Sequence, residues 1–340
     1  MAKGALSLPA AAAAELDRWW AELRRQPDRL PAGVEPVQTR LVRAVGRGVL
    51  PQVGDVHVKA MGFPRGKDRL RYAFRALPAV HEARLLQAVA AAGLRCPAVV
   101  TARGARRWGL PACSMLVTGT LPVMPAAAPA WSAMAAVAAR LAACGVFHPD
   151  LHSGNFLPLR DGATAVLDLQ SARQLPAPLE RGPRREMAAK LLLERDAAAL
   201  ETLEASGLVD PADRPDVLRR AAALRRAAVV RRILRCLQTS TEFVRERRWN
   251  GTLHRRRDAR LGPAALDGGG ELVRLWLGDR THHILDGQAP RLDALFRKYP
   301  WLPGRHSLYS SADRFILSRH GEHLLEGFER LESLRRGELL

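Results

Sequence analysis

The segment from Gly145 to Arg173 constrains the fold of this chain more than any other part of its sequence. Two short apolar runs, residues 156–159 and 164–167, are joined by Asp161-Gly162. Short apolar runs separated by an Asp-Gly pair predict a β-hairpin. Polar residues stand directly before the first run and directly after the second, so the hairpin would bring them together in space.

Three of these polar residues carry oxygen atoms that bind hard cations. Asp150 and Asn155 precede the first expected strand, and Asp168 follows the second. Mg²⁺ takes one or two carboxylates and completes its shell with water and substrate phosphates. The sequence therefore predicts a magnesium and phosphate site around the hairpin.

The same residues carry a resemblance to a known fold. The run His148-Pro149-Asp150-Leu151, with Asn155 five positions after Asp150, resembles the catalytic loop of the protein-kinase-like fold, and Asp168-Leu169-Gln170 resembles its metal-binding turn. The resemblance implies ATP and Mg²⁺ as cofactors. Asp150, with His148 beside it, would accept the proton of the attacking hydroxyl, while Asn155 and Asp168 would hold Mg²⁺. The alternative is a chance match of an acidic turn and a solvated loop.

Lys59 and Glu82 fit the same resemblance independently of the catalytic loop. Alternation in the run 56–61 puts Lys59 on the same strand face as His57, and residues 78–92 read as a helix that carries Glu82. The resemblance implies that Lys59 binds the α and β phosphates and that Glu82 holds it in place. An edge-strand charge and a solvated helix face are the alternatives.

Other nucleotide contacts are implied less directly. Gly46 and Gly48 would form a turn over the phosphates, and Thr118 and Thr120 belong to a hinge-like segment, LVTGTLP. A single GxG pattern is weak, and it also fits an ordinary turn. The chain departs from the protein-kinase pattern at Pro149, where an Arg is common, and after Leu169, where no Gly follows.

Within this fold, the chain looks like the lipopolysaccharide core kinases, the Kdo and heptose kinase group called InaA-like. The segments HPDLHSGNFL, HEARLLQAVAAAGLRCP, LVTGTLP and RRILRCLQTSTEFVRERR carry this likeness, which covers residues 38–258. It implies transfer of the γ-phosphate of ATP to a sugar hydroxyl of the lipid A core, at the inner face of the inner membrane. His152 also resembles the aminoglycoside and choline kinase branch, so a small-molecule kinase remains an alternative.

The charge of the chain favours an anionic partner. The formal net charge is +19, and only five of the 53 basic residues are lysines. An anionic glycolipid, a phosphorylated sugar or an anionic membrane surface would be attracted to such a chain. No nucleic-acid motif is present, and no obligate protein partner is indicated. A pseudokinase or basic binding scaffold is a further alternative. Residues expected to contact the acceptor are Arg173, Arg245, Arg247, Trp249 and Arg255, the last four around a hairpin turn at Asn250-Gly251.

These features predict an α+β, protein-kinase-like, two-lobed fold. Its parts would be an N-terminal helical extension at 1–37, a lobe with a small antiparallel sheet and one main helix at 38–120, a mostly helical lobe with the catalytic loop at 121–258, and a helical extension at 259–340. The four cysteines lie far apart without a CxxC pair, which argues against a zinc site or a disulfide scaffold. The cysteines therefore favour a reducing cytoplasm, and the family resemblance implies peripheral contact with the inner membrane.

Overall fold

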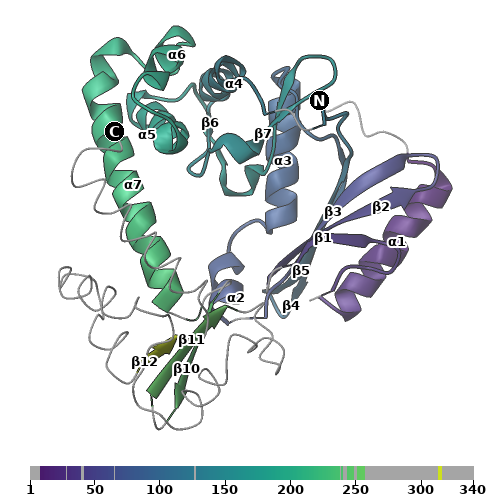
Figure 1. Ribbon diagram of the computed structural model, residues 1–340. Helices are drawn as coiled ribbons and strands as arrows, with labels where there is room; N and C mark the ends of the chain where they lie inside the picture. Colours follow the sequence, from purple (N-terminus) through teal and green to yellow (C-terminus); the bar gives the residue numbers. More distant parts are fainter. Residues whose placement is uncertain are drawn as a thin grey trace. The chain divides into compact units, whose positions relative to one another are not determined.

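The computed structural model describes residues 8–27, 29–39, 42–64, 66–125, 128–237, 239, 243–248, 251–256 and 313–315. The chain forms two compact units, Met1–Ala221 and Ala222–Leu340. The first combines a small antiparallel sheet with helices (Figure 1). The α+β fold class expected from the sequence is confirmed.

The sheet of the first unit has five strands in the order β1-β2-β3-β5-β4, each antiparallel to its neighbour. The strands are β1 (Glu35–Thr39), β2 (Arg43–Leu50), β3 (Gly54–Gly62), β4 (Val99–Arg107) and β5 (Leu110–Gly119). Strand β1 lies mostly before the region where the sequence predicts strands. All five of its residues are exposed, so it lacks the apolar and polar alternation that would reveal it.

Helices cover both faces of this sheet. On one face, helix α1 (Ala10–Arg25), which lies within the expected N-terminal helical extension, buries Leu16 and Trp19 against Val56 and Val58 of β3. On the other face lies α3 (Pro78–Ala91) (Figure 1). Since side chains of a strand alternate between faces, Lys59 points away from α1 and toward α3. A short helix, α2 (Gly66–Tyr72), follows β3.

The second half of the first unit is mostly helical. Its helices are α4 (Trp131–Ala143), α5 (Arg181–Leu191) and α6 (Ala199–Ala205), and α7 (Arg214–Leu237) begins in it. The short strands are β6 (Val146–Phe147), β7 (Phe156–Pro158), β8 (Thr164–Val166) and β9 (Arg173–Gln174), and the 3-10 turns are η1 (Ser153–Asn155), η2 (Leu169–Ser171), η3 (Leu192–Glu194) and η4 (Pro211–Asp213). Strands β7 and β8 pair antiparallel, which confirms the predicted hairpin.

The second unit contains a separate three-stranded sheet. Strand β10 (Phe243–Arg248) pairs antiparallel with β11 (Gly251–Arg256), as the Asn-Gly turn signal predicts, and β11 pairs parallel with β12 (Asp313–Phe315). Within the expected helical extension 259–340, the structure describes only β12. The expectation of a helix is wrong for these three residues, because they add a strand to the edge of β11.

Candidate active site

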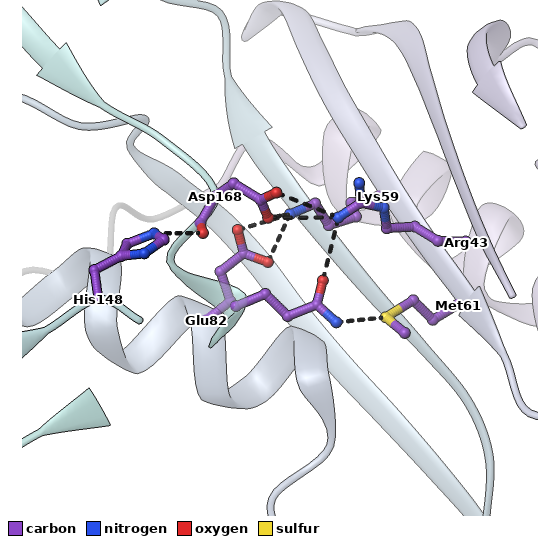
Figure 2. Close-up of polar contacts among 7 residues, drawn as sticks. Arg43, Lys59, Met61, Glu82, His148 and Asp168 are labelled. Atoms are coloured by element: carbon purple, nitrogen blue, oxygen red, sulfur yellow. Dashed lines mark hydrogen bonds and ion pairs between the residues drawn. The ribbon is translucent and has the colours of Figure 1, made fainter. Parts of the chain in front are cut away.

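Lys59 lies at the centre of a network that joins the sheet to α3 and to the turn after β8. Its ammonium group donates to both carboxylate oxygens of Glu82 at 2.8 Å and to Oδ1 of Asp168 at 2.9 Å (Figure 2). Glu82 is buried, with a residue exposure of 3%. Burial raises the pKa of the Glu82 carboxyl, while Lys59 pulls it in the opposite direction. Residues 59, 82 and 168, singled out separately in the sequence, thus share one polar cluster.

Asp168 begins η2 in the left-handed backbone conformation, with φ 53° and ψ 51°. Asp adopts this conformation more readily than most residues. A second cation, Arg43 of β2, approaches its carboxylate at 3.4 Å and 3.5 Å. Burial raises the pKa of Asp168, but Lys59 and Arg43 together outweigh burial, so its pKa lies below the ordinary value. Asp168 is therefore held ionised.

Arg43 and Gln170 explain how the turn is held without a glycine after Leu169. The side chain of Gln170 accepts from Arg43 at 3.5 Å and donates to the sulfur of Met61 at 3.3 Å. Leu169 is fully buried. Arg43 and Met61 are paired across β2 and β3, so both ends of the Gln170 amide bind to one pair of residues on neighbouring strands. Sequence reasoning missed Arg43, because nothing in the sequence distinguishes it from the many other arginines.

His148 joins the loop that carries Asp150 to the turn that carries Asp168. Its Nδ1 accepts from the backbone N–H of Asp150 at 3.3 Å, and its Nε2 lies 3.1 Å from the carbonyl oxygen of Asp168. An N–H can only donate and a carbonyl can only accept, so these partners select the neutral tautomer with the proton on Nε2. Burial lowers the pKa of His148, which favours the same neutral form. His148 positions both aspartates through their backbones.

Asn155 is buried at the end of η1 and lies next to the hairpin. Its Oδ1 accepts from the backbone N–H of His152 at 2.9 Å, and its carbonyl accepts from the N–H of Leu167 at 2.8 Å. The second bond ties Asn155 to the residue before Asp168. The Asn155 oxygen retains one lone pair, and Oδ2 of Asp168 has only the long contact with Arg43. One amide oxygen and one carboxylate oxygen fit a Mg²⁺ ion that takes its remaining ligands from water and phosphate.

No group of three or more His, Cys, Asp or Glu side chains within the described ranges is arranged to hold a metal ion. A metal at this site would therefore depend on Asn155, Asp168 and substrate oxygens rather than on a complete protein cage. This is the pattern expected for Mg²⁺ and not for Zn²⁺.

Asp150 is the most exposed acid of the site, with 73% of its side chain accessible. The ammonium of Lys190, on α5, lies 3.7 Å from Asp150 Oδ1 and is only 17% exposed. Helix α5 is itself fixed by hydrogen bonds from Arg181 to Asp213 at 3.1 Å and from Arg185 to Asp216 at 2.6 Å. The sequence holds a signal for Lys190, since it is one of only five lysines.

Gly46 and Gly48 do not form the expected phosphate-binding turn. Both lie inside β2, where a Cβ on Gly48 would come within 2.6 Å of Trp19 and a Cβ on Gly46 within 2.5 Å of Val34. Glycine is needed at these positions because α1 and the segment that follows it pack directly on the strand. The prediction that Gly46 and Gly48 lie in a loop is therefore wrong, because both glycines allow close packing against a strand.

The two hinge threonines lie at the end of β5 and directly after it, and Arg173 begins β9. Thr118 is buried in β5 and pairs with His57, and the backbone N–H of Thr120 donates to Asp55 at 3.2 Å. Arg173 is exposed at the start of β9 and pairs with Phe147, the residue before His148. Nucleotide contacts of the threonines and phosphate contacts of Arg173 stay predictions.

The four acceptor residues expected in the second unit are described only in part. Arg245 and Arg247 lie on β10, where they pair with His254 and Thr252, and Arg255 lies on β11 opposite Val244. Trp249 lies outside the described residues.

No family model matches the chain, and no curated protein does. Among solved structures, it is similar to WaaP in complex with acyl carrier protein, with 19% identity, a TM-score of 0.38 and coverage of 56% of this chain and 83% of that chain. It is also similar to WbdD in a co-crystal with the kinase inhibitor LY294002, with 15% identity, a TM-score of 0.34 and coverage of 52% and 46%. Similarity of this size says nothing about substrate, so the chemistry has to follow from the side chains of the site.

Proposed function

We propose that this chain is an ATP-dependent phosphotransferase that transfers the γ-phosphate to an alcohol group. The observation that carries the proposal is the ammonium of Lys59, bonded to a buried Glu82 and to Asp168, which lies 109 residues further along the chain. Lys59 is therefore a fixed cation beside the turn and loop that bear Asp168 and Asp150. Phosphoryl transfer depends on such fixed charges and on positioning more than on covalent chemistry.

Lys59 binds oxygens of the α and β phosphates in this proposal. Glu82 holds the ammonium in place from α3, and both of its oxygens are engaged in doing so. A bound nucleotide adds further acceptors for the same ammonium, whose side chain remains 17% exposed. Fixing Lys59 in advance lowers the reorganisation needed when the phosphates arrive.

Asn155 and Asp168 would hold Mg²⁺, which when bound would neutralise charge on the phosphate oxygens. The protein keeps Asp168 ionised through Lys59 and Arg43 and fixes its backbone through His148. Asn155 is fixed by the His152 N–H. These contacts fix the positions of the two oxygen donors before any ligand binds.

Asp150 accepts the proton of the attacking hydroxyl. Its exposed carboxylate can reach an acceptor that approaches from solvent, as a general base must. Lys190 lies beyond hydrogen-bond distance of Asp150 but within ion-pair distance, so it restrains the direction of the carboxylate and leaves it accessible. A compact ammonium suits this role better than the forked guanidinium of arginine. We assign Lys190 as a positioning residue for Asp150.

The acceptor that we propose is a sugar hydroxyl of the lipopolysaccharide inner core, reached at the inner face of the inner membrane. The family resemblance and the net charge of +19 support an anionic, phosphorylated acceptor. No helix among the described residues has the length and apolar character to span a bilayer, and the proposed location is a peripheral one. A cationic aminoglycoside would call for an acidic pocket, whereas residues 212–262 are strongly basic.

The decisive experiment is ATP turnover with Mg²⁺ against a panel of lipopolysaccharide cores, aminoglycosides and protein, with mass spectrometry of the products. We expect a core sugar that gains one phosphate, and no product from Asp150→Asn. Arg220→Met is a matched control, because it removes an exposed charge of α7 outside the site. A phosphorylated aminoglycoside would replace the acceptor assignment. No turnover with any acceptor, together with unmeasurable Mg-ATP binding, would favour a binding scaffold.

A further inference from the structure

Four large apolar side chains stand exposed near one end of the five-stranded sheet. They come from two segments: α2 with the residues after it, and the turn between β4 and β5. Phe74 is 96% exposed, Trp108 88%, Leu70 71% and Leu110 40%. We call these four residues the aromatic tip. Exposure of this degree means that the side chains protrude from the surface rather than line a groove.

Arg106 holds the two segments of the aromatic tip together. Its guanidinium donates to the carbonyl oxygens of Ala73 at 2.7 Å, Arg75 at 2.6 Å and Gly109 at 3.0 Å. Residues 73 and 75 flank Phe74, and residue 109 follows Trp108. The two aromatic side chains therefore belong to one fixed surface and not to two independent loops.

The backbone at Trp108 is unusual for a residue of its size. Trp108 and Gly109 both have positive φ, 50° and 76°, which is the pattern of a type I′ turn. Asn or Asp normally precedes the glycine of such a turn, because a bulky side chain is strained there. The Trp108 side chain is almost fully exposed, so its burial does not compensate for the strain of this backbone conformation. The residue therefore points to a role outside the fold.

The exposed charges next to the aromatic tip are positive, and the acid of α2, Asp68, is partly buried. Arg71, Arg75 and Arg107 are exposed, and the guanidinium of Arg107 lies 4.6 Å from the Trp108 ring centroid. No acidic residue occurs at positions 69–77 or 97–112. Protruding apolar side chains surrounded by arginines match the chemistry of an anionic bilayer surface, where the apolar groups enter the interface and the cations meet lipid phosphates.

Other occupants fit less well. Residues 222–256 carry ten arginines and two glutamates, so the arginines next to the aromatic tip would repel this part of the chain. A second copy of the chain carries the same net charge of +19 and would be repelled as well. Single-stranded nucleic acid binds in basic grooves whose aromatic side chains stack with bases. The aromatic tip instead protrudes, and two of its four residues are leucines that offer no stacking surface.

We propose that the aromatic tip is a docking surface for the anionic lipid bilayer. Phe74 and Trp108 enter the interface, and Arg71, Arg75 and Arg107 contact lipid phosphates. This inference deepens the proposed function, because it names the surface by which the enzyme would reach a membrane-bound acceptor. It concerns the first unit and is separate from the arginines of β10 and β11.

The test is flotation of the full chain with vesicles of phosphatidylcholine, alone or mixed with phosphatidylglycerol, without nucleotide. Phe74→Ser with Trp108→Ser should lower affinity for the mixed vesicles about tenfold or more, since burying one aromatic side chain is worth about that factor. Arg71→Gln and Arg75→Gln should each lower it about fivefold. Circular dichroism checks that the variants are folded.

A matched control is available at the other end of the same sheet. Val49 and Val53 are 64% and 38% exposed beside the β2–β3 turn, which the strand register puts at the end opposite the Trp108 turn. Val49→Ser with Val53→Ser should bind vesicles like the unchanged chain.

Equal vesicle binding by the aromatic variant and the control would overturn the proposal. So would stronger competition by a single-stranded oligonucleotide than by anionic vesicles, or a loss of self-association in the aromatic variant with no change in vesicle binding. Because the assay contains no nucleotide or acceptor, its result stands apart from the result of the turnover panel.

Discussion

Replacing Lys59 by Met should make the stability of the fold depend more strongly on pH than it does in the unchanged chain, where the pKa of Glu82 is already raised by burial. As an isolated strand cation, Lys59 could be replaced by an apolar side chain of similar length at no cost. In the structure Lys59 is not isolated, because it neutralises a Glu82 side chain that is only 4% exposed. Without the ammonium, Glu82 has to stay charged in a buried position or take up a proton.

The free energy needed to protonate Glu82 sets the upper limit of the stability that the variant loses. The ordinary pKa of the Glu82 carboxyl is 4.5. Neutralising it costs about 1.36 kcal/mol for each pH unit above that value, which is about 3.4 kcal/mol at pH 7 and about 0.7 kcal/mol at pH 5. A carboxyl that takes up a proton on folding makes stability rise as the pH falls. Lys59 also lowers the pKa of Asp168, so the substitution raises that pKa, while Arg43 still lowers it.

Urea unfolding of the two proteins at pH 5 and pH 7 measures this effect. We expect Lys59→Met to lose about 2 to 3 kcal/mol more at pH 7 than at pH 5. Adding Glu82→Leu to Lys59→Met should remove the part of the pH dependence that comes from Glu82. It should not restore turnover, because the cation that we propose to bind the phosphates is still absent. His148 contributes its own pH dependence to both proteins, so it cancels in the comparison. A loss of equal size at both pH values would refute the reasoning that Glu82 depends on Lys59 for its charge.

Three further substitutions test separate parts of the site. Asp168→Asn should abolish turnover mainly by weakening Mg-ATP binding, because a neutral amide balances less of the charge of the metal; calorimetry that shows unchanged affinity would contradict this. Lys190→Met should lower kcat about tenfold or more at unchanged Mg-ATP affinity, and Arg220→Met is the control that should have no effect. Equal kinetics in both variants would show that Lys190 does not belong to the site. Gly48→Ala should lower stability by about 1–3 kcal/mol through overpacking against Trp19 and leave the KM for ATP unchanged; a raised KM with normal stability would restore its role in a phosphate loop.

The sequence by itself determined the parts of this protein that depend on neighbouring residues. Asp150, Asn155 and Asp168 lie within 19 consecutive residues, and a hairpin with a two-residue turn signal brings them together. Helices α1 and α3 follow from apolar periodicity and from the positions of proline and glycine at their ends. Such features are decided by hydrogen bonds and side-chain alternation over a few residues, which a sequence shows directly.

Only the tertiary structure decided which distant residues meet. Asp168 contacts Lys59 and Arg43, more than 100 positions away, and Lys190 lies beside Asp150 because α5 packs next to the catalytic loop. Gly48 has a clear pattern in the sequence, but its reason is the approach of α1 to β2. These contacts arise from the packing of whole elements around a shared core. A pattern of residue types cannot specify them, because the same arginine or glycine serves equally well on a surface, in a turn or under a helix.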